Sequence, residues 1–423
     1  APRVTEALID NPGGIRDWLD DHGLTVKFDN VNEFAGIISG GRSGPSYGGS
    51  SNAGQYGLGI DADMERLAGL TGLSLHTIFV GRYGTPISNN IPDGLNPSQE
   101  IYGAGGNVVV HHVMTYAEQT LLDNKLDIAL GWLPVANDFA ASPLNCTFMN
   151  NSICGNPKTL FGTNAFSSYP DGVWGGRVRY EPVPEFYGQA GVYAYNNGLY
   201  TNKYYRTGFE FNSSQISGIV IPVELGWRPE FFAGDPDRRL PGHYKIGAAP
   251  TPNGQVTDTF YDVNGQPAAL TGLPFRKVRG TYNLWVTADQ MVHRYGPGPQ
   301  DGMILLAYYT HQDGSVAIRQ DQFTAGIINR GFWRERPQDS INAMFSYTKV
   351  SSDVIKFQNL QAIQDPFFRD FQNHTFNIEF NYNIHLFPGV DFQPDFQYYI
   401  NPNAQKNIPD AALLGFKTHI EFF

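Results

Sequence analysis

Long hydrophobic runs are absent from this sequence of 423 residues. No stretch approaches the roughly 18 consecutive apolar residues of a membrane-spanning helix, which excludes the helical class of membrane proteins. Basic residues are also scarce, with 29 Lys and Arg against 40 Asp and Glu, so extensive nucleic-acid binding is not expected. Motifs of the G-x-S-x-G, H-E-x-x-H and P-loop types are missing as well. We therefore expect neither an enzyme nor a cofactor.

Cysteine is limited to Cys146 and Cys154, which lie close together in the segment CTFMNNSICG. A single short-range pair in a Gly-, Asn- and Pro-rich segment is typical of a disulfide in an oxidising compartment such as the periplasm or the cell surface. We predict that the two are disulfide-linked, and two unrelated free thiols are the alternative. The first ten residues show no charged start followed by an apolar core. We expect either an unsecreted protein or one whose signal peptide has been removed.

Alternation of apolar and polar side chains is the strongest pattern that is present. In residues 373–387 (NHTFNIEFNYNIHLF), the even positions from Phe376 to Leu386 are apolar and the odd positions are all polar. A period of two over this length predicts one long β-strand with two unlike faces. We expect Phe380 to face an apolar surrounding that rejects charge, and its neighbour Asn381 to face water and tolerate it.

Sixteen segments with this alternation follow one another along the chain. They lie near 24–39, 52–65, 72–84, 107–120, 124–133, 172–181, 186–196, 217–228, 242–249, 276–289, 302–311, 318–330, 340–351, 373–387, 391–400 and 412–423. The connections tend to alternate in length. Short ones lie at 120–124, 181–185 and 388–390, and long ones at 84–107, 134–171, 196–216, 250–275 and 352–372. Short turns on one side and long loops on the other are typical of transmembrane barrels.

The N-terminal segment has a different pattern. In NPGGIRDWLDDHG, Ile15, Trp18 and Leu19 share a helical spacing, and Gly23 can end the helix. We predict a short periplasmic helical segment in residues 1–23 and a single sixteen-stranded antiparallel barrel in residues 24–423.

Two kinds of all-β protein have strands with one apolar and one polar face. In a soluble sandwich the strands are usually about five or six residues long, whereas several segments here exceed ten. A transmembrane barrel turns its apolar face to lipid and its polar face to an aqueous lumen, so we favour the barrel. The chain ends in Phe423, and outer-membrane barrels commonly end in an aromatic that their assembly machinery recognises. In the usual pattern the last residue belongs to the apolar face, whereas here the alternating apolar positions end one residue earlier, at Phe422.

Several segments are similar to a known family. SPLNCTFMNNSICGNP at 142–157 and YPDGVWGGRVRYEP at 169–182 resemble the signature segment of the carbohydrate-selective porins of the OprB type. IYGAG at 101–105 and the segments YGLGIDADMERLAGLTG and GLTVKFDNVNEFAG resemble that family's first strands. The resemblance implies a sixteen-stranded barrel in the outer membrane of a Gram-negative bacterium, which passes glucose and other sugars down their gradient. In that membrane we expect contacts with lipids and lipopolysaccharide, and a monomer or weak oligomer.

A sugar offers hydroxyl groups and an apolar ring face, so a selective constriction should place charged or amide side chains beside an aromatic ring. Strand parity and the loop positions give the candidates for such a constriction. They are Arg177, Arg179 and Glu181 in 172–181, Lys277, Arg279, Asn283 and Trp285 in 276–289, and Arg82 at the start of the 84–107 loop. Arginine and glutamate can grip vicinal hydroxyls, and Trp285 offers a stacking plane. Alternatively, these charges only hydrate the lumen and pair with one another.

Other readings of the sequence lead to different functions. A general or anion-preferring porin is one, because the basic candidates could attract small anions. A secreted soluble all-β carbohydrate-binding protein is another. His111–His112 is the most metal-like feature, but adjacent strand residues point to opposite faces, so we predict no shared metal ion there.

Overall fold

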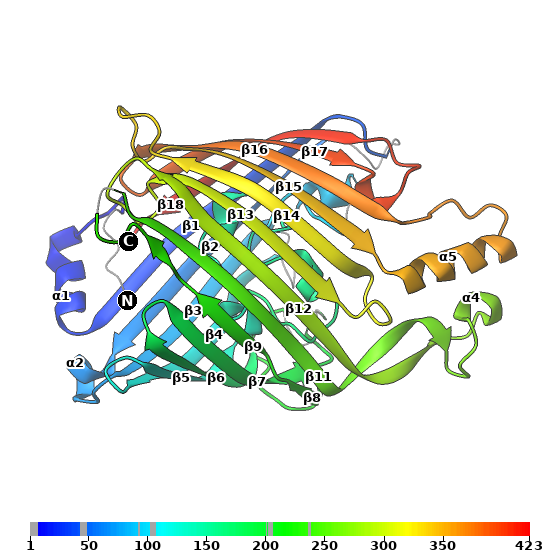
Figure 1. Ribbon diagram of the computed structural model, residues 1–423, viewed down its shortest axis with the longest axis horizontal. Helices are drawn as coiled ribbons and strands as arrows, with labels where there is room; N and C mark the ends of the chain where they lie inside the picture. The colour runs from blue at the N-terminus through cyan, green and yellow to red at the C-terminus, as the bar shows by residue number, and fades with distance from the viewer. Residues whose placement is uncertain are drawn as a thin grey trace.

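Each alternating segment pairs antiparallel with the next along the chain, and the last strand returns to the first. β1 (Leu24–Ser39) pairs with β18 (Ala411–Glu421) from Asp29–Glu421 to Ser39–Ala412, so the sheet closes on itself (Figure 1). The computed structural model describes residues 7–42, 49–91, 94–101, 107–199, 201, 206–235 and 238–423. Closure leaves no free strand edge, so the backbone hydrogen bonds are satisfied where lipid offers no partner.

The other strands follow in chain order. They are β2 (Ser50–Asp63), β3 (Leu73–Gly84), β4 (Val108–Leu121), β5 (Leu126–Leu133), β6 (Val173–Val183), β7 (Phe186–Asn196), β8 (Ile216–Val220), β9 (Val223–Trp227), β10 (Glu230–Phe231), β11 (Leu240–Asp262), β12 (Phe275–Arg294), β13 (Gly302–Gln312), β14 (Arg319–Arg330), β15 (Ser340–Val350), β16 (His374–Phe387) and β17 (Val390–Ile400). β8 and β9 both pair with β7, and β9 and β10 both pair with β11. These three pieces form one interrupted strand, so the eighteen segments make the sixteen-stranded barrel that the alternation predicts.

Short helices lie at both ends of the barrel (Figure 1). The 3₁₀ turn η1 (Pro12–Gly14), α1 (Ile15–Asp21) and α2 (Met64–Ala68) lie at one end, and α4 (Ala268–Thr271) and α5 (Ser352–Gln364) lie at the other. The predicted N-terminal helix is confirmed as α1. Gly23 follows it with a φ of +82°, a left-handed conformation that favours glycine. No helix in the described part of the chain is long and apolar enough to cross a membrane.

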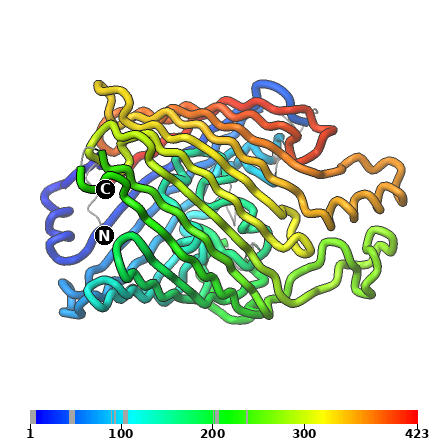
Figure 2. Tube along the Cα trace, in the orientation of Figure 1, coloured from blue at the N-terminus to red at the C-terminus, as the bar shows by residue number. Residues whose placement is uncertain are grey.

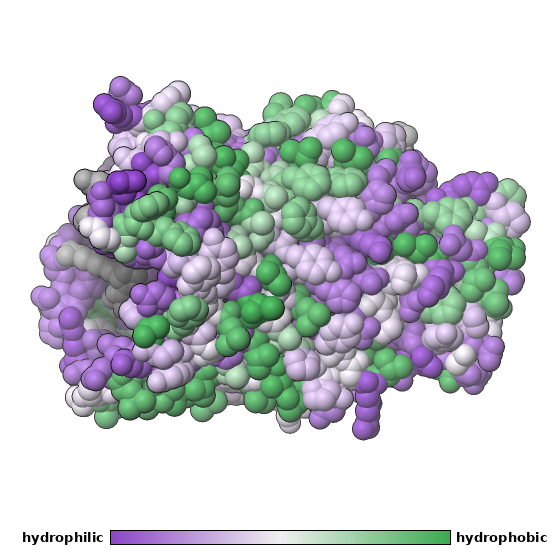
Figure 3. Space-filling view, viewed as in Figure 1, coloured by the Kyte–Doolittle hydropathy of each residue, from purple (hydrophilic) through white to green (hydrophobic). Residues whose placement is uncertain are grey.

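The two faces of the wall differ as the alternation requires. On β16, Phe380 is 53% exposed on the outer face, whereas its neighbours Glu379 and Asn381 are 0% and 4% exposed on the inner face. Figure 3 shows apolar residues spread over the barrel wall, while the end that carries α1 and α2 is mostly polar. Tyr282, Leu284 and Val286 of β12 are likewise exposed on the outer face.

The hairpin β11–β12 is longer than predicted. The sequence patterns placed its strands near 242–249 and 276–289 with a loop at 250–275, whereas β11 continues to Asp262 and β12 begins at Phe275. The hairpin extends past the rest of the wall and carries α4 at its tip (Figure 1). Beyond the wall neither face needs to be apolar, so the strands continue without the alternation that reveals them elsewhere.

Two connections fold into the barrel instead of standing outside it. Residues 134–172 join β5 to β6 and are called the pore loop below, and residues 85–91 and 94–101 belong to the connection between β3 and β4. Figure 2 shows the pore loop as a teal trace inside the tube of wall strands. The pore loop contains η3 (Val135–Asn137), η4 (Asn145–Thr147) and η5 (Lys158–Phe161), and residues 85–91 contain η2 (Ile87–Asn89). A further turn, η6 (Pro402–Ala404), lies between β17 and β18.

Candidate functional site

Glutamates on the inner wall hold the pore loop in place. Glu379 of β16 accepts hydrogen bonds from the backbone N–H of Met149 at 2.8 Å and of Asn150 at 2.9 Å. Glu224 of β9 accepts one from the backbone N–H of Ala140 at 2.9 Å. Both glutamates are at most 2% exposed. An ionised carboxylate has several acceptor positions, so each one satisfies loop donors that would otherwise be buried without a partner.

Residues 85–91 and 94–101 are attached to the wall in the same way. Glu33 of β1, fully buried, accepts a hydrogen bond from the backbone N–H of Ile101 at 3.0 Å. Gln99 connects the two parts, because its amide donates to the Glu33 carbonyl and accepts from the backbone N–H of Ile87, each at 2.6 Å. The lumen is therefore narrowed from two sides by chain segments that buried hydrogen bonds fix to the wall.

An opening of about 350 Å³ remains between the pore loop and the wall. Strands β1, β2, β4 and β18 supply one side of it, and Glu100 and the pore loop supply the rest. Its lining consists of Val31, Gln55, Glu100, Met114, Pro134, Ala136, Asn137, Cys146, Cys154, Gly155, Asn156, Tyr169 and Lys417. The opening thus brings together an ammonium group, a carboxylate, three amides and an aromatic ring.

Hydrogen bonds fix the polar groups around this opening. The Lys417 ammonium donates to the Cys146 carbonyl at 3.2 Å and lies 3.8 Å from the Glu33 carboxylate. Gln55 donates to the Tyr169 hydroxyl at 3.2 Å and accepts from the Arg82 guanidinium at 2.8 Å. The Arg82 guanidinium also lies 5.9 Å from the centre of the Tyr169 ring. These contacts orient the ring and the amide before any solute arrives.

The predicted disulfide is confirmed. Cys146 and Cys154 are bonded and close a short loop within the pore loop. Both line the opening, so the disulfide forms part of its rim.

Arg177 lies on the inner face as predicted, but its guanidinium is paired with carboxylates. It contacts three carboxylates, those of Glu118 at 2.6 Å, Asp127 at 2.7 Å and Asp138 at 3.0 Å, and the residue is 6% exposed. Asp138 belongs to the pore loop and the other two to the wall. Arg177 therefore ties the pore loop to the wall, and its charge is already compensated by the three carboxylates.

Arg179 and Glu181 face the lumen farther along β6. Their side chains pair at 2.8 Å, and Glu181 also pairs with Arg228 at 2.7 Å. The Arg179 guanidinium lies 4.0 Å from the centre of the Tyr187 ring. All three charged side chains are between 25% and 29% exposed, so water reaches them.

The four predicted site residues on β12 fall into two pairs, one on each side of Gly280. Asn283 and Trp285 turn inward, but they are at most 1% exposed under the pore loop. The Trp285 indole donates to Glu224 at 2.7 Å, and its ring packs against Phe166. The Trp285 ring, which was predicted to stack on a sugar, is therefore covered. Strand parity predicts a water-filled lumen beside it, but the pore loop occupies that space.

Lys277 and Arg279 do not follow the predicted parity. Gly280 has a φ of +91°, and the pairing register of β11 with β12 shifts there, which is a β-bulge. Beyond the bulge Val278 packs against the buried cluster, and Lys277 and Arg279 are exposed, with Lys277 at the edge of a cavity that Thr163 and Asn164 of the pore loop also line. Lys277 donates to the Thr257 hydroxyl at 2.6 Å. Extending one alternation across a bulge reverses the faces.

Most residues around the opening were missed by the sequence-based prediction. Asn137, Asn156 and Tyr169 lie in irregular loop structure, which carries no periodic signal. Lys417 could have been found, because it alternates with Phe416 and Thr418 in a predicted strand. Of the eight predicted site residues, Arg82 is the one in contact with this lining.

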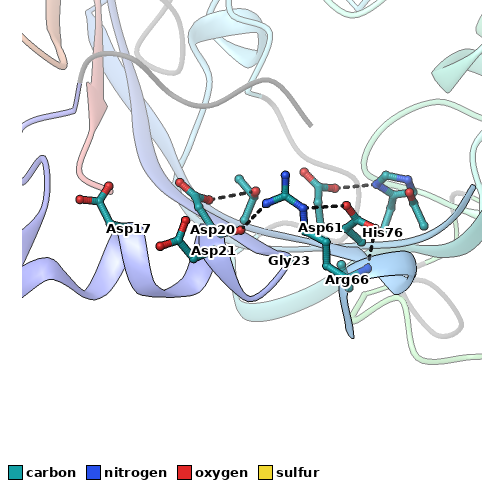
Figure 4. Close-up of a pocket in the computed structure, with 11 residues that line it drawn as sticks. Asp17, Asp20, Asp21, Gly23, Asp61, Arg66 and His76 are labelled. Atoms are coloured by element: carbon teal, nitrogen blue, oxygen red, sulfur yellow. Dashed lines mark hydrogen bonds and ion pairs between the residues drawn. The ribbon is translucent and has the colours of Figure 1, made fainter. Parts of the chain in front are cut away.

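A second cavity, of about 650 Å³, lies at the end of the barrel that carries α1 and α2 (Figure 4). Its lining includes Asp17, Asp20, Asp21, Asp61, Asp63, Arg66 and His76. His76 contacts Asp61 at 2.6 Å through Nδ1 and Glu118 at 3.2 Å through Nε2. Since Glu118 also pairs with Arg177, a row of alternating charges runs from this cavity to the pore loop. The excess of carboxylates disfavours anions at this mouth.

Three comparisons with known proteins agree. The family model described as "Carbohydrate-selective porin, OprB family" matches residues 48–422. Porin B of Pseudomonas aeruginosa is 28% identical over 423 residues, covering 97% of this chain and 90% of that protein. The high-pH structure of Pseudomonas putida OprB has a TM-score of 0.90 at 26% identity, covering 99% of each chain.

Proposed function

The chain belongs to the OprB family of carbohydrate-selective porins, and from this premise we propose that sugars bind in the opening between the pore loop and strands β1, β2 and β18. The protein is a passive, sugar-selective channel of the outer membrane and not an enzyme. The observation that carries the proposal is the convergence of Lys417, Glu100 and the Tyr169 ring around one opening between the pore loop and the wall.

The chemistry of the lining suits a neutral polyol. Lys417 can donate and Glu100 can accept hydrogen bonds, and the amides of Gln55, Asn137 and Asn156 can do both. Tyr169 offers a face for the apolar side of a sugar ring. A volume of about 350 Å³ falls within the range of about 300–1,000 Å³ that small-molecule sites occupy. The opening exposes these groups without enclosing a solute, so binding stays weak enough for flux.

The predicted residues take different roles in this proposal. Arg82 orients the Gln55 amide and the Tyr169 ring, and Arg177 positions the pore loop. Arg179 and Glu181 form a second set of polar contacts on the way to the acidic cavity. We propose monosaccharides such as glucose as the solutes.

The surroundings of the barrel belong to the proposal too. We propose a monomer or weak oligomer in contact with lipids and lipopolysaccharide, which the barrel-assembly machinery inserts. Residues 1–23 then lie on the periplasmic side, and the single barrel spans residues 24–423.

Charge pairing argues against the anion-preferring alternative. Arg177 is surrounded by three carboxylates and Arg179 is paired with Glu181, so neither presents an uncompensated positive charge to a passing anion. The cavity at the α1 end is acidic as well. The soluble alternative is disfavoured by large outward-facing residues such as Leu225 and Phe380, which are 65% and 53% exposed.

The test replaces the ammonium group at the opening. Lys417→Met should weaken the saturation of glucose flux about two- to tenfold, because a lost hydrogen bond is worth about 0.5–1.5 kcal/mol. Glucose-dependent block in single-channel recordings and liposome swelling with glucose, a disaccharide and an amino acid of matched size are the measurements. Lys356→Met is the matched control, because Lys356 lies on α5 with its side chain 63% exposed and pairs with Asp353. A changed conductance with unchanged glucose block would place the sugar site elsewhere.

A further inference from the structure

The seam where the barrel closes carries three side chains that can bind a metal ion. His419 and Glu421 of β18 and Asp29 of β1 each offer one ligand atom, and these atoms all lie within 4.8 Å of one another. The three residues occupy alternate positions on the inner face, as do Lys417 of β18 and Glu33 of β1. They therefore belong to the first and the last strand of the chain.

Both carboxylates of this group approach the same ring nitrogen. Nε2 of His419 lies 3.2 Å from Asp29 Oδ2 and 3.8 Å from Glu421 Oε2. One nitrogen carries at most one hydrogen, so it can donate well to only one of the two oxygens. The second oxygen of Glu421, Oε1, is buried and has no hydrogen-bond partner in the described part of the chain. The hydrogen bonds within this group therefore leave carboxylate oxygens without a donor.

Other histidines of the lumen are arranged differently. His76 also meets two carboxylates, but Asp61 approaches Nδ1 and Glu118 approaches Nε2, so the oxygens lie on opposite sides of the ring. His243 meets Asp289 at 2.7 Å through Nδ1. The convergence of two carboxylates on one nitrogen sets His419 apart from both.

We propose that Asp29, His419 and Glu421 bind a divalent transition-metal ion of the Zn²⁺ class, with water completing the shell. Zinc bonds to nitrogen and oxygen are about 2.0–2.2 Å long, so donors at tetrahedral corners lie about 3.4 Å apart. The separations of 3.2 and 3.8 Å are close to this value, and rotation of the two carboxylates closes the third side. The imidazole nitrogen favours such an ion over Mg²⁺ or Ca²⁺, which prefer oxygen.

The electrostatics of the site favour a cation. Within the described residues, neither Asp29 nor Glu421 forms an ion pair with lysine or arginine. Lys27 and Arg16 act on Glu421 through space, but Arg16 pairs with Asp10 at 3.4 Å. The His419, Asp29 and Glu421 side chains are 40%, 29% and 17% exposed, so an ion in the lumen can reach them. A bound ion would join β1 to β18 and stabilise the closed barrel.

The test is calorimetric titration of the folded, detergent-solubilised protein with Zn²⁺ alone. The wild type should bind one equivalent, and its thermal unfolding temperature should rise with added Zn²⁺. His419→Asn should weaken binding more than tenfold and abolish the thermal shift, because losing a ligand costs at least as much as the 10–100-fold typical of its supporting contacts. His243→Asn is the matched control, because it removes a lumenal histidine that faces one carboxylate.

If His419→Asn fails to fold, Glu421→Gln still tests the proposal. This substitution replaces one carboxylate oxygen by an NH₂ group and so removes one charged ligand with little change in shape. It too should weaken binding more than tenfold. Absence of a saturable site in the wild type would overturn the proposal. Equal affinity in the wild type and in the folded seam variants would overturn it as well, because the ion would then bind elsewhere.

Discussion

Replacing Glu379 by glutamine should release the pore loop from one side of the wall while the barrel stays folded. The carboxylate is fully buried and accepts three hydrogen bonds, from the backbone N–H groups of Met149 and Asn150 and from the Asn381 amide. Two of the three come from the pore loop. The strand pairing of β16 does not depend on them, because its partners are the backbones of β15 and β17.

The magnitude follows from the groups that lose their partner. Glutamine keeps one carbonyl oxygen, but its NH₂ group faces a backbone donor, so one loop N–H remains buried without an acceptor. That costs about 1–3 kcal/mol, and the remaining bond loses its charge assistance, for a total of about 2–4 kcal/mol. Asp395 also interacts with Glu379, and the loss of one negative charge there favours the lower end of this range. Since each 1.4 kcal/mol is a factor of ten, the undocked loop becomes about 30- to 1,000-fold more populated.

Single-channel recording in planar bilayers measures this change directly. Glu379→Gln should show a larger and noisier conductance, because the undocked loop no longer narrows the lumen. Glucose block should weaken in parallel, since the loop forms one side of the opening. Phe380→Leu is the control, because Phe380 is the next residue on the strand and faces outward. Wild-type conductance and noise in Glu379→Gln would refute the idea that this carboxylate holds the loop.

Two further predictions concern the outer face and the disulfide. Phe380→Arg should lower the free energy of unfolding by about 2–4 kcal/mol if the position lies near the bilayer midplane, and urea unfolding in lipid vesicles measures it; an unchanged midpoint would contradict the outward assignment. Replacing Cys146 and Cys154 by serine should leave the barrel folded but weaken glucose block, because the loop between the two residues loses a constraint worth about 2–3 kcal/mol in chain entropy. Unchanged glucose block in that variant would show that this loop keeps its shape without the bond.

The wall of the barrel could be predicted from the sequence because its physics is local. A strand between lipid and the lumen interior must alternate, and the alternation marks all sixteen strands, including three pieces that together make one of them. The short helix before β1 was predicted from spacing and from Gly23. Strand ends were less predictable where lipid no longer constrains either face, as in the β11–β12 hairpin.

The contents of the lumen could not be predicted in the same way. Parity placed Arg177 and Trp285 on the inner face, but it carries no information on the loop that packs against them. Asn381 shows the same limit. We expected it to face water and accept an arginine, whereas it is 4% exposed and donates to the Thr147 carbonyl at 3.2 Å. The expectation that Asn381 faces water is wrong, because the pore loop replaces the water at this position.

Selectivity for a neutral solute follows from how the lumen uses its charges. Glu33, Glu224 and Glu379 are occupied with backbone donors of the inner segments, and Arg177 is occupied with three carboxylates. These charged groups hold the inner segments that shape the passage. They attract or repel a passing ion only weakly, because each is already paired with nearby hydrogen-bond donors or opposite charges. Few charged groups line the opening itself, and the other polar groups there are neutral amides and the Tyr169 ring. A solute that binds at the opening must form hydrogen bonds in several directions and place an apolar face against the Tyr169 ring. A sugar meets both requirements, whereas a small inorganic ion meets neither.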